Sequence, residues 1–223
     1  GLVAAHNGGI INLFSEAIIV TIGINIILAV GLNLIIGFSG QFSLGHAGFM
    51  AIGAYAGAIL SANNPTFGGF LSGLLVGMLV SGFVALVVGI PTLRLKGDYL
   101  AIATLGVAEI IRILLINLRG LTNGPAGIFG LPQFSNWQIV FIFAFLSILV
   151  VSNFIHSGPG RATLAVREDE IAAASMGVNT TKYKVIALVM GAVLASIAGT
   201  LYASFQQSGF SSEERRGGKE CRS

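Results

Sequence analysis

The longest uncharged stretch of this chain decides what it can fold into. From Ala17 to Leu93 the sequence contains no Asp, Glu, Lys or Arg, whereas about 20 apolar residues are enough for one helix to cross a lipid bilayer. This stretch is therefore long enough for about three membrane-spanning helices. Charged residues make up 9% of the whole chain, compared with about 25% in soluble globular domains. The chain is an integral membrane protein.

Polar and turn-forming segments divide the apolar sequence into six expected helices. We place them at about 12–36, 46–62, 68–90, 98–118, 137–155 and 185–205. A membrane barrel would instead show strands of about 10 residues with alternating polarity, and these runs do not alternate. The expected fold class is therefore all-α: a polytopic transmembrane helix bundle with about six spans.

The segment 156–184 is the one long charge-bearing stretch between apolar runs, and it is a candidate docking surface for another protein. Within it, Arg167 to Met176 predicts one helix of about ten residues, with Gly177 as its C-terminal cap. If this segment is cytoplasmic, alternation of the spans places 37–46 and 91–97 inside as well. Only Arg119 then lies in an outside loop, as the positive-inside rule requires. The inside basic residues are Arg94, Lys96, Arg161, Arg167, Lys182 and Lys184.

The two ends of the sequence suggest that it is incomplete. No initiator Met or basic signal-peptide region precedes the first expected span. From Glu213 to Ser223, seven of eleven residues are charged. We expect a transmembrane domain over 1–210 and a non-native tail over 211–223, with a native basic tail beside anionic lipid as the alternative. Cys221 is the only cysteine, so no disulfide can form within the chain, and no metal or redox role is expected for it.

Small residues recur at every fourth position in several of the expected helices. Such stripes allow helix backbones to approach closely in lipid. We expect them to mediate packing between helices of this chain, and a seam between subunits is the alternative. The glycines that carry this expectation are Gly69, Gly73, Gly77, Gly191 and Gly199.

Polar residues at membrane depth are costly and often mark a transport path. Glu109 and Arg112 are three residues apart on one expected helix, so they share a face and can form an ion pair. A gate or substrate contact is the alternative role for this pair. Two glycine-rich segments, 37–55 and 122–127, can hold irregular backbone that lines a cavity. A tight loop without a ligand is equally compatible with both segments. Their candidate translocation residues are Ser39, Ser43, Gly45, His46 and Asn123.

Four segments of the sequence resemble the branched-chain amino acid permease family. They are 31–55, 97–106, 121–132 and 160–202, and the resemblance extends over about 12–210. Within the family, they are similar to the M-type subunit of the ATP-binding cassette (ABC) importer for leucine, isoleucine and valine. The resemblance implies a type II-like permease in the bacterial inner membrane. It also implies four kinds of partner: two ABC ATPase subunits, a second related permease subunit, a periplasmic amino acid binding protein and the lipid bilayer.

The resemblance also implies a role for the segment 156–184 as a cytoplasmic ATPase-docking loop. Permeases of ABC importers carry a loop that reads Glu-Ala-Ala, then three residues, then Gly. Ala172, Ala173 and Gly177 match this spacing, whereas Ile171 occupies the Glu position and Glu170 lies one residue earlier. Docking through Glu170, Ala172, Ala173 and Gly177 is therefore what the resemblance implies.

The sequence also limits the alternatives. It has no ATP-binding loop of the Gly-x4-Gly-Lys-Ser/Thr kind, so ATP hydrolysis is expected in partner chains. No constellation of nucleophile, base and acid and no metal-ligand spacing is present. We expect no enzyme activity, cofactor, metal or nucleic-acid partner. A urea or short-amide permease is the alternative within the importer class. A secondary transporter is the alternative from another class, although it should show ionisable residues at the membrane midplane.

Overall fold

The structure is a computed structural model, and it describes residues 13–41, 43–63, 66–92, 95, 98–117 and 137–220. All regular structure in these residues is helical, which confirms the expected all-α class. In chain order, the helices are α2 (Leu13–Asn33), the π-helix η1 (Leu34–Phe38), α3 (His46–Asn63), α4 (Phe67–Thr92), α5 (Asp98–Asn117), α7 (Trp137–His156), α8 (Gly158–Glu168), α9 (Glu170–Ser175) and α10 (Thr180–Glu220).

Five helical segments in the described residues are long and apolar enough to cross a membrane. They are α2 together with η1, α4, α5, α7 and α10. The expected second span, at about 46–62, is a shorter apolar helix over His46–Ala62. The described residues between η1 and His46 are not helical. The 18 residues of α3 extend over about 27 Å at 1.5 Å per residue.

The last helix begins at Thr180, earlier than the expected start at 185. The reason is a local cap: the side-chain oxygen of Asn179 accepts a hydrogen bond from the backbone amide of Lys182 at 3.1 Å. Asn at this position satisfies one of the free amides of the first turn. The polar residues at the start of α10 are therefore helical, and the spanning part continues the same helix.

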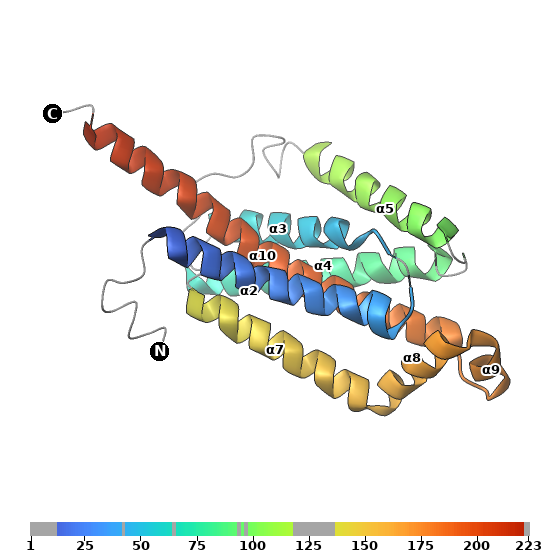
Figure 1. Ribbon diagram of the computed structural model, residues 1–223. Coiled ribbons are helices and arrows are strands. Elements are labelled where there is room, and N and C mark those ends of the chain that lie inside the picture. Colours follow the sequence, from blue (N-terminus) through green and yellow to red (C-terminus); the bar gives the residue numbers. More distant parts are fainter. Residues whose placement is uncertain are drawn as a thin grey trace.

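α10 is the centre of the bundle. It packs against α2, α3 and α4 (Figure 1), and 67% of its spanning segment is buried, compared with 17% for α5. Figure 1 shows α7 along the side of α2 and α5 on the other side of the bundle, where its main contact is α3. α5 and α7 are therefore peripheral helices that expose large apolar surfaces.

Glycines on α4 face the neighbouring helices α3 and α10. A Cβ atom on Gly73 would lie 3.0 Å from the Cα atom of Gly57, and one on Gly77 would lie 3.0 Å from the hydroxyl of Ser196. Gly69 is also buried. Because lipid supplies no hydrophobic drive between helices, close backbone contact of this kind holds them together.

The glycines of α10 lie against other helices in the same way. A Cβ on Gly191 would collide with the side chain of Ile35 in η1, and one on Gly199 would collide with the backbone carbonyl of Met50 in α3. Beside this contact, the hydroxyl of Thr200 donates to the carbonyl of Gly53 at 2.9 Å. The α3–α10 seam thus combines a glycine, which allows the two backbones to approach closely, with an interhelical hydrogen bond.

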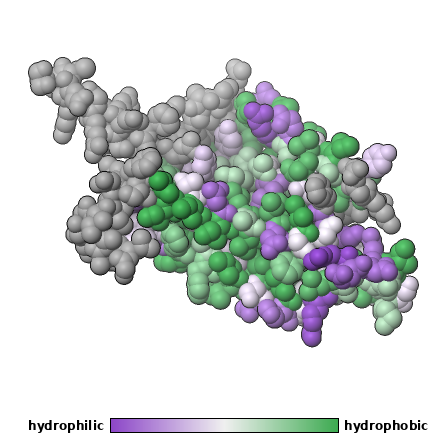
Figure 2. Space-filling model, in the orientation of Figure 1, coloured by the Kyte–Doolittle hydropathy of each residue, from purple (hydrophilic) through white to green (hydrophobic). Residues whose placement is uncertain are grey.

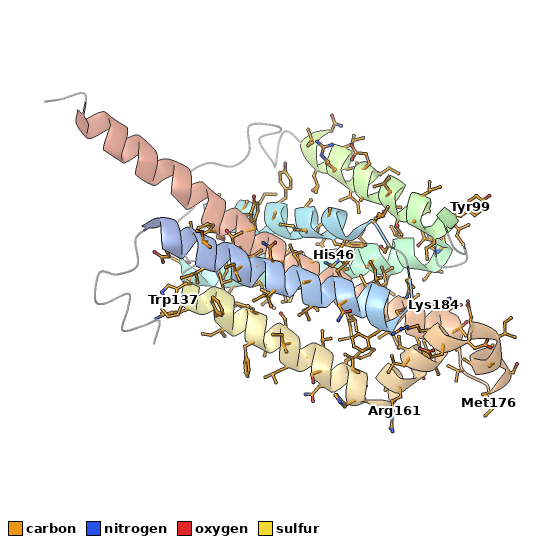
Figure 3. The ribbon with its side chains drawn as sticks, in the orientation of Figure 1. His46, Tyr99, Trp137, Arg161, Met176 and Lys184 are labelled. Carbon is orange, nitrogen blue, oxygen red and sulfur yellow. The ribbon has the colours of Figure 1, made fainter. Side chains whose placement is uncertain are left out.

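A large group of polar side chains lies at one end of the molecule. Figure 3 places Tyr99, Arg161, Met176 and Lys184 at this end and Trp137 at the opposite end. Figure 2 shows hydrophobic side chains over the middle of the molecule and hydrophilic ones around α8 and the start of α10. The described residues of 37–41 lie at the same end as 156–184, and their side of the membrane stays a prediction.

Candidate functional site

The polar segment forms two short helices, α8 and α9, instead of the single helix predicted over 167–176. α8 begins behind Ser157, whose hydroxyl accepts a hydrogen bond from the amide of Gly160 at 3.3 Å. The break falls at Asp169, whose backbone is extended and whose carboxylate accepts from the amides of Ile171 at 2.9 Å and Ala172 at 3.0 Å. The prediction was wrong because an Asp side chain can compete with the backbone for these amides and start a new helix.

Gly177 ends α9, as the sequence predicted. Its φ is +84°, in the left-handed region that favours glycine. The amide of Val178 donates to the carbonyl of Ala173 at 3.1 Å, and the amide of Gly177 donates to that of Ala174 at 3.0 Å. These two bonds form a Schellman motif. The position of α9 is therefore set by a carboxylate at its start and a glycine at its end.

Arg167 connects α8 to the loop that follows η1. Its guanidinium donates to the carbonyl of Gly37 at 2.6 Å, where a positive charge at the C-terminal end of a helix is favourable. The loop turns at Gly40, whose φ is +65°, and a Cβ there would lie 3.0 Å from Cγ of Arg167. Glycine at position 40 thus allows the positive φ of the turn and leaves room for the side chain of Arg167.

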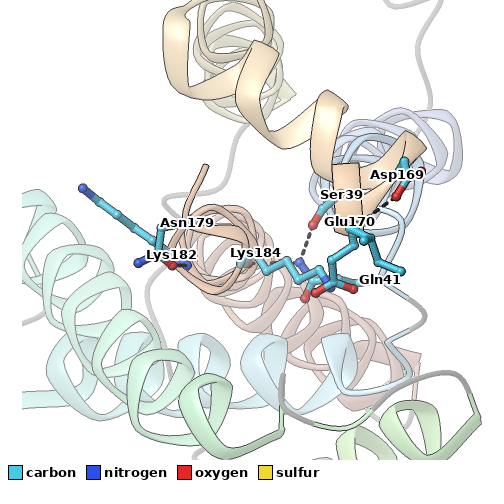
Figure 4. Close-up of polar contacts among 8 residues, drawn as sticks. Ser39, Gln41, Asp169, Glu170, Asn179, Lys182 and Lys184 are labelled. Atoms are coloured by element: carbon cyan, nitrogen blue, oxygen red, sulfur yellow. Dashed lines mark hydrogen bonds and ion pairs between the residues drawn. The ribbon is translucent and has the colours of Figure 1, made fainter. Parts of the chain in front are cut away.

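A second connection joins this loop to the start of α10 (Figure 4). The side-chain amide of Gln41 donates to the carbonyl of Lys184 at 3.0 Å and to the hydroxyl of Ser39. The ammonium of Lys184 in turn lies 2.9 Å from the carboxylate of Glu170 on α9, with 17% and 37% of the two side chains exposed. The loop, α9 and α10 are therefore joined by polar contacts at the polar end of the molecule.

The residues expected in ATPase docking differ in their exposure. Ala173 is 6% exposed and belongs to the core, whereas Ala172 and Gly177 are exposed. Two apolar residues that the sequence reasoning did not select are more prominent: Ile171 is 76% exposed and Met176 is 84% exposed. Their apolar character beside charged residues was the available signal. Exposed apolar side chains at the polar end of a membrane protein are suited to contact another protein.

The hydroxyls of the candidate translocation path are engaged within the glycine-rich loop. Ser39 and Ser43 are 2% and 3% exposed, and Ser43 accepts from the amide of Gly45 at 3.4 Å. A Cβ on Gly45 would lie 2.9 Å from the carbonyl of Thr104 in α5. These contacts hold the loop between α5 and the bundle. They do not test transport, and a role of these residues in translocation stays a prediction. Asn123 lies outside the described residues.

His46 is a buried polar residue of this region. Its ring nitrogens are buried, with the backbone of Leu28 in α2 beside the ring. The ring lies against Gly31 of α2, where a Cβ would be 3.2 Å from Cε1 of His46. Its role in translocation also stays a prediction. In the described part of the chain, no group of three His, Cys, Asp or Glu residues is placed to hold a metal ion.

Comparison with known proteins gives this architecture a family. The family model for the permease component of branched-chain amino acid transport systems matches residues 14–216. The chain is 40% identical over 201 residues to the high-affinity branched-chain amino acid transport system permease protein LivM of Salmonella typhimurium, covering 74% of this chain and 46% of the relative. LivM of Escherichia coli is 38% identical over the same shares. A probable branched-chain amino acid transport permease protein LivM of Methanocaldococcus jannaschii is 27% identical over 66% of this chain and 46% of the relative.

The chain spans about half the length of these curated relatives. No solved structure matches it. The family model nevertheless covers every membrane-spanning helix described above. The chain is therefore a multi-pass membrane protein that belongs to the permease component family of branched-chain amino acid transport systems.

Proposed function

We propose that this chain is the membrane-spanning permease subunit of an ABC importer that carries leucine, isoleucine and valine across the bacterial inner membrane. The observation that supports this most strongly is the family match over residues 14–216. The proposed partners are two ABC ATPase subunits, a second related permease and a periplasmic amino acid binding protein. The ATPase subunits hydrolyse ATP, and this chain contributes half of the membrane pathway.

The proposed ATPase contact is the exposed face of α9. Ile171 and Met176 extend from it with 76% and 84% of their surface exposed, so they can enter a groove of a partner without disturbing the bundle. Ala172 beside them is small and allows close approach. Glu170 is paired with Lys184 of the same chain. We therefore assign Glu170 to holding α9 on α10, and assign the ATPase contact mainly to the apolar side chains.

The contacts of α8 and α9 provide a route by which ATPase movement reaches the membrane. Arg167 bonds to Gly37 at the end of η1, and Gln41 bonds to Lys184 at the start of α10. A displacement of α9 therefore acts on the loop that leads directly into α3. Ser39, Ser43 and Gly45 lie on this loop and His46 begins α3, which supports their assignment to the moving part of the translocation path.

Co-purification and uptake measurements with the full-length chain and its partner subunits test this proposal. We expect Ile171→Asp and Met176→Asp to lower ATPase association and radiolabelled leucine uptake at least tenfold, because a charge in an apolar groove is unpaired. Arg161→Gln is the control, since Arg161 is exposed on α8, away from α9 (Figure 3). Unchanged association and uptake in both variants contradict the docking surface. Uptake of urea instead of leucine by the wild-type complex contradicts the assigned substrate.

A further inference from the structure

α5 carries an ion pair at membrane depth on its outer side. The guanidinium of Arg112 lies 2.9 Å from the carboxylate of Glu109, and the two side chains are 64% and 54% exposed. At 1.5 Å per residue, Glu109 is about 16 Å along the helix from Asp98 and about 12 Å from Asn117. Arg112 is about 8 Å from Asn117, so the ion pair lies in the half of the spanning segment that ends at Asn117.

Direct contact of these charges with lipid is energetically unfavourable. Charged side chains at the centre of a bilayer are costly, and they usually face protein or a water-filled cavity. α5 buries its opposite face instead: Ala101, Thr104 and Ile111 are 9%, 6% and 8% exposed. The ion pair therefore faces away from the described bundle, with more than half of each side chain exposed.

The residues around the ion pair form a surface with a distinct chemistry. Ile102, Gly106, Glu109 and Ile113 follow one another at helical spacing, so they form a stripe along one face. Ile102 is 66% and Ile113 is 50% exposed. A Cβ on Gly106 would meet no atom within 4 Å, so the stripe has an open notch beside Glu109. It offers one carboxylate, one guanidinium and two branched apolar side chains.

We propose that this stripe is a binding site for the zwitterionic amino acid on its way through the membrane. The inference rests on the proposed function and adds a site to it. Glu109 accepts hydrogen bonds from the substrate ammonium, and Arg112 donates to the substrate carboxylate with its planar fork. The apolar substrate side chain lies along Ile102 or Ile113. The Glu109–Arg112 pair opens as these contacts form, so each charge exchanges one opposite partner for another and none is left unpaired.

A charge-swapped variant separates this role from a structural one. E109R/R112E keeps an ion pair at the same spacing but reverses the positions of its charges. An ion pair that only stabilises α5 tolerates the swap. The same holds for a pair that contacts a partner helix and needs only zero net charge. A substrate site does not tolerate it, because the ammonium, the carboxylate and the side chain of an L-amino acid have one handedness. An L-amino acid that turns to match the reversed charges cannot keep its side chain on the same isoleucine. We therefore expect leucine uptake to stay at least tenfold below wild type in the swapped variant, as in E109Q and R112Q.

The experiment uses the full-length chain in the complete transporter, with radiolabelled leucine uptake and ATPase co-purification as separate readouts. Leu114→Ile is the matched control, since Leu114 is 58% exposed but lies about 140° around the helix from Glu109. Arg112→Lys is a second variant that keeps the charge and loses the fork; we expect severalfold lower uptake with normal co-purification. Recovery of uptake in the swapped variant, or unchanged uptake in R112K, overturns the site. Absence of leucine uptake by the wild-type transporter contradicts the proposed function itself.

Discussion

Two glycines with positive φ control the backbone of the candidate site. Gly40 turns the loop under the stem of Arg167, and Gly177 ends α9 with a Schellman motif. Their surroundings differ: a Cβ on Gly40 would press on Arg167, whereas one on Gly177 would meet no atom within 4 Å. Gly177 is therefore required by its backbone conformation alone, and a substitution there isolates the conformational contribution.

We expect Gly177→Ala to destabilise the end of α9 by about 1–2 kcal/mol, the usual cost of a left-handed conformation for an L-residue. Amide hydrogen exchange in α9 should become faster by about tenfold or more. Gly158→Ala is the matched control, because its Cβ also meets no atom within 4 Å while its position is in the first turn of α8. Equal exchange rates in the two variants would show that the cap does not hold α9.

At the scale of elements, the seam between α3 and α10 organises the bundle. Gly53 and Gly57 of α3 lie against Ser196 and Thr200 of α10, and Gly199 lies against Met50. The buried hydroxyl of Ser81 on α4 adds a hydrogen bond to the carbonyl of Ala192 at 2.9 Å, which fixes α4 to the same helix. The three helices therefore form one packed unit that α2 and α5 contact, and α7 packs mainly against α2.

Gly199→Ala is expected to lower the thermal unfolding midpoint, because its methyl group would collide with the carbonyl of Met50 and force α3 away from α10. Overpacking of this kind costs about 1–3 kcal/mol. The measurement is thermal unfolding of the detergent-solubilised protein, followed by loss of the monodisperse species. Gly82→Ala is the control, since its Cβ would lie 3.6 Å from Val193, at ordinary contact distance. Similar midpoints for both variants would contradict the seam as the stabilising contact.

At the scale of the whole molecule, the polar contacts around Lys184 and the ion pair of α5 lie in different parts of the structure. Lys184 lies at one end and Trp137 at the other (Figure 3). The contact between Gln41 and Lys184 therefore belongs to the end that holds Lys184. The ion pair of α5 lies between the ends, on the outside of the bundle. The proposed docking and transmission contacts therefore share one end of the molecule, and the proposed substrate contact lies apart from them on α5.

Cysteine labelling tests the orientation of the molecule. In a Cys221→Ser background, we expect Gln138→Cys, in the first turn of α7, to react with a membrane-impermeant maleimide in intact spheroplasts. Met176→Cys should react only after the membrane is permeabilised, because the positive-inside rule places α9 in the cytoplasm. Both positions are exposed, so accessibility to the reagent is the only difference. Labelling of Met176→Cys before permeabilisation would require the inverse topology.

Local features of the chain could be predicted from the sequence. The Glu109–Arg112 ion pair follows from a spacing of three residues on a helix, and the cap at Gly177 follows from glycine after a short polar helix. The break at Asp169 is also a local feature, and the predicted single helix over 167–176 is wrong there. An Asp whose carboxylate can cap the next turn was the available signal.

The sequence by itself determined that the chain is a helical membrane protein, where most of its spans lie and which residues share a helix face, because these depend on hydropathy and on contacts within one or two turns. Only the tertiary structure decided that α10 is central, that Glu170 pairs with Lys184 instead of projecting from α9, that Ala173 is buried and that Arg167 reaches Gly37. The Arg167–Gly37 contact joins positions 130 residues apart. Such pairs depend on how several helices pack at once, and no local pattern specifies that packing.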